Sequence, residues 1–332
     1  MASWPYVFAS QPAGNVPASY LDSNFNAAMF SAGTSQNGYV PVWSGAAGNL
    51  LAGGWAIGTS ANNLVQLNGS AQLPAVDGSL LTGIGSALVP RNYIAGYTLS
   101  NDAGSPNTVL DIAAGSAADS TNTQNINLGS AYTKSTAGLW AAGTGANGMG
   151  VGLTIANSTW YHVFAIINAG NPDVYFDTSV TAANKPVGTT YFRRIGSFLT
   201  DGSAHIISFL QVGNFFYYAP STDYSSTSTQ ALTLTTMRVP FGVVTQPLLS
   251  TNFTVSVSGN ATVSVAPASS SALAYSLAVT GTSATATSGD TSIGPPTNTS
   301  SQIYIGVTLT SGALSQGIIN TNGYFDSRGA NN

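Results

Sequence analysis

The chain has 332 residues, and its shortage of charge is the first feature that narrows its class. Only 5% of the residues are charged, against roughly 25% in an ordinary soluble domain. The 43% that are hydrophobic exclude an intrinsically disordered chain. Seven Lys and Arg and a formal net charge of −4 argue against a nucleic-acid partner, because binding phosphates needs a basic footprint.

The residue types that replace the missing charge point to strands and to assembly. All eleven acids are Asp, there is no Cys, and Ser, Thr, Asn, Gly and Ala are abundant. Few long helices are therefore expected. Such a neutral surface can be buried between subunits without desolvating charges, which favours an oligomer. No apolar run is long enough for a membrane span, and the N-terminus lacks a signal-peptide pattern, so we predict no membrane insertion.

In chain order, residues 1–33 predict one short amphipathic helix. Leu21, Phe25 and Met29 recur at helical spacing, and Ser19 with Asp22 has the form of a capping box. This helix would either pack on its own chain or form one leg of a cluster about an oligomer axis. Residues 34–88 have only short apolar runs between Gly-rich turns, so they predict a linker or a slender shaft shared by several chains.

From residue 89 to residue 332 the sequence predicts a β-rich domain. Residues 160–167, 173–176, 206–210 and 215–218 are rich in β-branched and aromatic side chains. Residues 253–257, 262–265 and 303–309 alternate with period two, which predicts one buried and one wet face. Many short strands between Gly, Asn, Asp and Pro turns favour a β-sandwich or barrel over a parallel α/β sheet.

Motifs for cofactors and metals are weak. Residues 143–148 match G-x-G-x-x-G, but further glycines follow where the fingerprint needs a helix, so we predict a flexible loop and no cofactor. His162 and His205 are too few ligands for zinc without Cys or Glu, and we assign both structural roles. Residues 119–122 lack the spacing of a calcium loop, so the turn-forming role is preferred and no metal is predicted.

Catalytic sets are equally thin. There is no G-x-S-x-G elbow. Asp173 and Asp177 are the nearest pair of acids in the β region, yet on one strand they would lie about 13 Å apart. That separation exceeds what glycoside hydrolysis uses, so the sequence predicts no catalytic residue and no enzyme.

Aromatic side chains are the better candidates for function. Exposed Trp and Tyr present a flat apolar face and a polar tip, which suits contact with sugars or protein surfaces. In residues 215–218, alternation should send one Phe–Tyr pair to each side of the strand. The receptor-binding candidates are Trp140, Trp160, Tyr161, Tyr217 and Tyr218. The alternative role for each of them is core packing or subunit contact.

Several segments, in order, make the chain resemble the tail-fibre and head-fibre (spike) proteins of bacteriophages. They include PASYLDSNF at residues 17–25, LVQLNGSAQLPAVDGSLLTG at 64–83 and YFRRIG at 191–196, and GYFDSRG at 323–329. Shorter matching pieces lie at residues 89–94, 111–120, 161–164 and 173–177. The matching segments are scattered over most of the chain.

The resemblance implies a homotrimer exposed on the virion surface after assembly in the host cytoplasm. Its N-terminal segment, residues 1–33, would join other virion proteins, residues 34–88 would form the shaft, and residues 89–332 the distal head. It implies adhesion to a host-surface glycan or protein receptor and supplies no catalytic residue. Two alternatives remain open: a purely structural capsid or baseplate decoration protein, and a polysaccharide depolymerase spike.

Overall fold

The computed structural model describes residues 90–255, 259–280 and 291–329, together with four two-residue strands between residues 39 and 56. The chain divides into two units, Met1–Gly85 and Ser86–Asn332, and each is described by itself. In the first unit, β1 (Tyr39–Val40) pairs with β4 (Trp55–Ala56), and β2 (Trp43–Ser44) pairs with β3 (Asn49–Leu50). The predicted helix of residues 1–33 and the rest of the predicted shaft lie outside the described residues.

The described part of the second unit is built from strands. Apart from the single 3-10 turn η3 (Ser271–Leu273), no helix occurs among its described residues. The prediction of a mainly β fold is therefore confirmed. Across the described residues, no helix is long and apolar enough to cross a membrane.

One mixed sheet of twelve strands runs through the second unit in the order β14-β12-β13-β11-β10-β7-β6-β15-β16-β23-β18-β21. A smaller sheet, β5-β8-β9, accompanies its first half. The strands of this half are β5 (Ile94–Gly96), β6 (Leu99–Asn101), β7 (Val109–Ile112), β8 (Gly115–Ala118), β9 (Asn125–Leu128), β10 (Tyr132–Leu139), β11 (Asn147–Met149), β12 (Trp160–Asn168), β13 (Asn171–Asp177), β14 (Thr189–Leu199) and β15 (Phe209–Val212).

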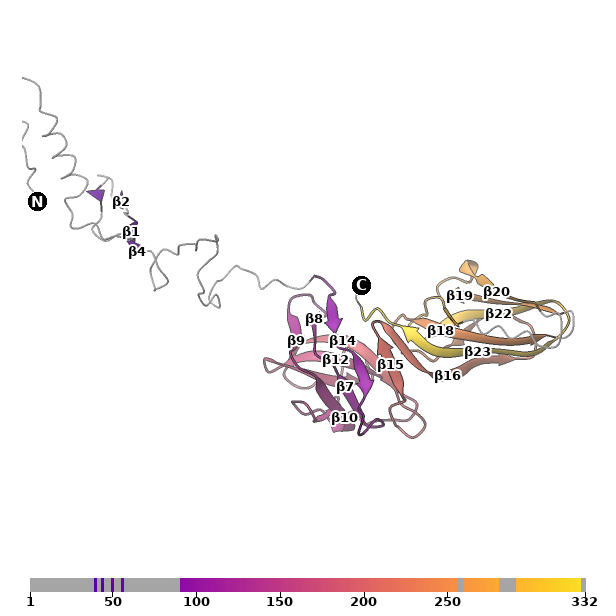
Figure 1. Ribbon diagram of the computed structural model, residues 1–332, viewed down its shortest axis with the longest axis horizontal. Helices are drawn as coiled ribbons and strands as arrows, with labels where there is room; N and C mark the ends of the chain where they lie inside the picture. Colours follow the sequence, from indigo (N-terminus) through magenta and orange to yellow (C-terminus); the bar gives the residue numbers. More distant parts are fainter. Residues whose placement is uncertain are drawn as a thin grey trace, which may run out of the picture. The chain divides into compact units, whose positions relative to one another are not determined.

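The second half pairs the rest of the large sheet with a four-stranded sheet, β17-β22-β19-β20. Figure 1 shows β16, β23 and β18 side by side, with β19, β20 and β22 in a layer next to them. The strands are β16 (Phe215–Ser226), β17 (Gln230–Thr236), β18 (Gln246–Val255), β19 (Asn260–Pro267), β20 (Tyr275–Thr280), β21 (Thr291–Ile293), β22 (Gln302–Ser311) and β23 (Leu314–Phe325).

A single apolar core joins these sheets. Phe253 and Ile319 from the large sheet belong to the same buried cluster as Val263 and Ile305 from the four-stranded sheet. On β18 and β19 the buried positions alternate with half-exposed ones, as the period-two pattern predicts. At residues 215–218 the predicted division is also confirmed, because Phe216 and Tyr218 are buried while Tyr217 is exposed.

The strands β12 and β13 depart from simple alternation because both of their faces are covered. Val163 and Phe176 lie in the main core, whereas Phe164 and Tyr175 stack at 5.4 Å in a second cluster on the other face. A strand buried on both faces reads as a continuous apolar run rather than as an alternation. Ionisable side chains on β12 and β13 are therefore buried and need buried partners.

The prediction of a flexible loop at residues 143–148 is wrong for the last two of these residues. Gly143 and Gly145 form a turn with positive φ, but Asn147–Met149 is strand β11, which pairs in parallel with β10 and β13. A Cβ on Gly148 would lie 2.8 Å from the Phe176 ring, so close strand packing explains this glycine. The residues after the glycine motif form a strand and then a turn, not the helix that a nucleotide-binding fingerprint requires.

Candidate functional site

An open hollow at the start of β12 contains one of the predicted receptor-binding residues. Its volume is about 380 Å³, within the range of small-molecule sites. Trp160 is half-buried there, at the point where the chain enters the strand from the turn at Ser158. Seven residues line it: Ser158, Trp160, Leu199, Thr200, Asp201, Gly202 and Arg238.

Aromatic packing holds Trp160 in place. Its ring meets Tyr324 edge-on at 5.6 Å, and Tyr324 stacks on Phe216 at 4.9 Å. The Tyr324 hydroxyl donates a hydrogen bond to the backbone carbonyl of Ser197, which fixes the tyrosine against β14. The indole therefore keeps one orientation, and a ligand would not need to order it.

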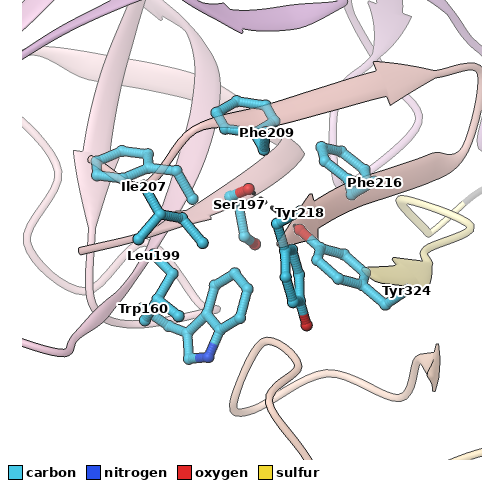
Figure 2. A pocket seen from close by; sticks show the side chains of 9 residues that line it. Trp160, Ser197, Leu199, Ile207, Phe209, Phe216, Tyr218 and Tyr324 are labelled. Carbon is cyan, nitrogen blue, oxygen red and sulfur yellow. Dashed lines mark hydrogen bonds between the residues drawn. The ribbon is translucent and has the colours of Figure 1, made fainter. Parts of the chain in front are cut away.

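Figure 2 shows the apolar side chains behind Trp160, which face one another around a narrow slot. The volume of this slot is about 10 Å³, no more than one water molecule needs, and its accessible lining is apolar. Leu199 and Phe209 line it with the aromatic residues. The slot is too small for a ligand and serves as packing that supports Trp160.

A short loop presents the acid of the hollow. Asp201 is 45% exposed, and its Oδ1 accepts hydrogen bonds from the backbone N–H groups of Ser203 at 2.7 Å and His205 at 2.9 Å. These two N–H groups are the main cause that lowers the pKa of Asp201, and the nearby His205 ring contributes less. The carboxylate is therefore ionised at neutral pH and has a fixed position.

Arg238 supplies the positive charge of the hollow. Its guanidinium lies over the Tyr218 ring at 5.4 Å, and its backbone N–H donates to the Asp223 carboxylate at 2.9 Å. The Tyr218 hydroxyl donates to the backbone carbonyl of Arg238. In the described part of the chain, no hydrogen bond uses the Arg238 guanidinium, so its donors are unpaired.

The other four candidates lie elsewhere. Trp140 is half-buried in the second cluster, where its indole N–H donates to the carbonyl of Val174 at 3.1 Å. Tyr161 is 1% exposed, stacks on Phe198 and donates to the carbonyl of Thr154. Tyr218 is only 9% exposed, and its ring packs under the Arg238 guanidinium.

Tyr217 is the one candidate in an exposed apolar surface, which we call the apolar ladder: Leu210, Val212, Phe215 and Tyr217. The pairing of β15 with β16 sets Leu210 opposite Tyr217 and Val212 opposite Phe215. Leu210 and Val212 are more than half exposed, and Phe215 stacks on Tyr217 at 6.2 Å. None of these four side chains lines the Trp160 hollow or the slot behind it.

Sequence reasoning identified Trp160 but missed Asp201 and Arg238. Asp201-Gly202 is visible only as a turn signal, and Arg238 stands alone between strands. Two other polar residues, His162 and Asp119, have the structural contacts predicted for them. His162 is buried and hydrogen-bonds the Ser197 hydroxyl, and Asp119 accepts the N–H groups of Thr123 and Gln124, which makes it a turn former.

Asp173 and Asp177 both have structural contacts. Asp173 pairs with the buried ammonium of Lys134 at 2.7 Å. Asp177 accepts hydrogen bonds from Ser179 and Asn184, which closes the loop after β13. Neither carboxylate lines the Trp160 hollow.

The chain matches no protein-family model, no curated protein and no solved structure.

Proposed function

We propose that the protein is a non-enzymatic fibre or spike protein of a bacteriophage virion, and that it adheres to a host-surface glycan through the Trp160 hollow. The observation that supports this most is the pairing of a pre-ordered indole with Asp201 and Arg238 around one open volume. A sugar ring has apolar C–H faces and a rim of hydroxyls. An aromatic face beside a fixed carboxylate and a guanidinium suits both parts.

The homotrimer is part of the same proposal. The charge-poor surface and the apolar ladder support burial between copies, because neither requires charges to be desolvated. Three copies would make weak glycan sites effective through multivalency. Light scattering on the full chain at micromolar concentration tests this, and a stable monomer would contradict it.

The adhesion proposal is tested with an array of host-surface oligosaccharides and the full chain, followed by calorimetry on the best ligand. Trp160→Ala is expected to weaken binding at least about tenfold, which corresponds to about 1.4 kcal/mol. Phe241→Ala is the matched control, because it removes an exposed aromatic ring outside both the hollow and the apolar ladder. Its affinity is expected to equal that of the wild type.

A second variant keeps the test meaningful if Trp160→Ala fails to fold. Asp201→Asn retains an oxygen for the two backbone N–H groups and lies at the surface, so only the charge is lost. A several-fold loss of affinity is expected. If both variants bind as the wild type does, adhesion through this hollow is wrong.

The alternative of a decoration protein predicts a different result. It predicts that the wild type binds no host glycan and still incorporates firmly into particles. A depolymerase predicts shortened polysaccharide chains after incubation, which chromatography would detect.

A further inference from the structure

A second pocket in the same unit gathers an unusual share of the basic residues. Its volume is about 470 Å³, and three of the chain's seven Lys and Arg line it: Arg193, Arg194 and Arg328. Asp326 is the one acid among the lining residues. Phe192 and Val244 form part of an apolar wall. In a chain with 5% charged residues, this concentration needs a physical explanation.

The fold brings the three arginines together from distant parts of the sequence. Arg193 and Arg194 lie on β14 next to a bulge, where Ile195 has no partner between Arg194 and Gly196. A bulge re-aims neighbouring side chains, so two consecutive arginines both line the pocket, which regular alternation would prevent. Arg328 arrives from the segment after β23 and accepts a hydrogen bond from Arg193 Nη2 at its backbone carbonyl, at 3.0 Å.

The pocket contains more buried positive charge than it neutralises. Arg193 is 6% exposed and Arg328 7%, and the only ion pair that the arginines make among the described residues is Arg194 with Asp326, at 2.7 Å. The nearby Asp119 carboxylate attracts Arg193 electrostatically but forms no ion pair with it, and its oxygens accept backbone N–H groups of its own turn. Buried charges in proteins are normally paired. Three guanidinium groups and two carboxylates, Asp326 in the pocket and Asp119 beside it, leave one positive charge in excess.

The arginines are also held ready for a ligand. Arg193 Nη2 donates to the carbonyl of Asn92 at 3.2 Å, and Arg328 donates through Nε to Asn214 at 3.1 Å and through Nη1 to Gly96 at 3.2 Å. Nε and Nη1 of Arg193 make no hydrogen bond in the described part of the chain, and neither atom is sealed from solvent. Burial is the largest cause that lowers the pKa of Arg193 and of Arg328. Neighbouring arginines add to the shift, while Asp119 opposes it at Arg193 and Asp326 opposes it at Arg328.

We propose that this pocket binds the oxyanion of an acidic sugar, a carboxylate or a phosphate group. Guanidinium forks match the two oxygens of such groups, and the interaction is strongest where water is excluded. The wall of Phe192 and Val244 would contact the sugar ring. This site is separate from the Trp160 hollow, with which it shares no lining residue, and it does not rest on the proposed virion function.

Calorimetry on the full chain at constant ionic strength tests the proposal. The probes are glucuronate, glucose 6-phosphate, inorganic phosphate and neutral glucose. Glucuronate or glucose 6-phosphate is expected to bind at least about tenfold more tightly than inorganic phosphate, with no binding of glucose. Equal affinity for inorganic phosphate would overturn the assignment to a sugar. No binding of any anion would overturn the site itself.

A negative charge added at the edge of the pocket tests the proposal without changing the arginines. Val244 lines the pocket and is 57% exposed, so Val244→Glu can supply an internal counter-ion without disturbing the core. We expect it to bind anions at least about tenfold more weakly than Val244→Gln, which matches the Glu variant in shape but adds no charge. Arg91→Gln, an exposed arginine outside the pocket, controls for net charge. Equal binding by the Glu and Gln variants would overturn the proposal.

Discussion

Two regions of the second unit differ in whether their buried interior contains charged side chains. The region of β10 to β14 buries Lys134, Asp173, His162 and Arg193 within or beside its core. The four-stranded sheet β17-β22-β19-β20 contains no charged residue, and its buried positions are apolar. Several of the chain's few charges thus lie on strands that are covered on both faces or in the arginine pocket. The neutral sheet depends on packing alone.

The largest expected effect comes from breaking the buried ion pair of the charged region. Lys134 is fully buried, and Asp173 also accepts the N–H of Gly143 at 2.8 Å. Asp173→Ala should lower the free energy of unfolding by about 3–5 kcal/mol, because an unpaired ammonium stays in the core. Chemical denaturation measures this.

The matched control replaces both partners at once. Lys134→Met with Asp173→Leu removes both buried charges, so it should cost less than the single change. If the double variant is as unstable as Asp173→Ala, the unpaired charge of Lys134 is not the cause of the lost stability.

The next effect is a pH dependence confined to the charged region. Burial, and secondarily the charge of Arg194, lowers the pKa of His162 from 6.5 to about 4, although Asp326 and Asp177 favour the charged form. The unfolded chain therefore takes up the proton first. The contribution of neutral His162 to the free energy of unfolding is fully present above pH 6.5. It falls by about 3 kcal/mol as the pH drops to about 4.

Denaturation midpoints between pH 7.5 and pH 4 measure this dependence. His162→Gln should be less stable at pH 7.5, because it alters the contact with Ser197, but its stability should fall less steeply with decreasing pH. Parallel curves for the variant and the wild type would rule out His162 as the source.

A smaller effect is expected from trimming the neutral core. Ile305 on β22 is fully buried, so Ile305→Val should cost about 0.5–1.5 kcal/mol from the lost methylene and the space it leaves. This loss should be the same at pH 7.5 and pH 5, in contrast to the loss in His162→Gln. Thr308→Ser, at an exposed position of the same strand, is the control and should change stability by less than about 0.5 kcal/mol.

The smallest effect on stability is expected at the edge of the neutral sheet. Thr233 is exposed on β17, which is an outer strand of its sheet among the described residues. Thr233→Lys should change the free energy of unfolding by less than about 0.5 kcal/mol, while the charge reduces strand-to-strand association. Light scattering on heating should show later aggregation, and an unchanged onset would indicate that this edge is not where chains associate.

Much of the β structure could be predicted from the sequence because its signals are local. The alternation in residues 262–265 and 303–309 specifies a buried face whatever lies opposite, and it reappears in β19 and β22. The turn-forming Asp119 is equally local, since its carboxylate bonds N–H groups only a few residues away. Gly148 was misread as loop because its partner, Phe176, lies on another strand.

The candidate sites depended on long-range pairing, and the sequence could not supply it. Alternation gives a strand two faces but does not say what covers each one. Tyr161 and Tyr218 are therefore buried while Tyr217 is exposed. Asp201 and Arg238 join Trp160 only through the folded chain, and Arg193 meets Arg328 across 135 positions. The sequence alone determined a charge-poor β protein, and tertiary structure decided where its few charges and exposed rings converge, because convergence depends on strand pairing rather than on local pattern.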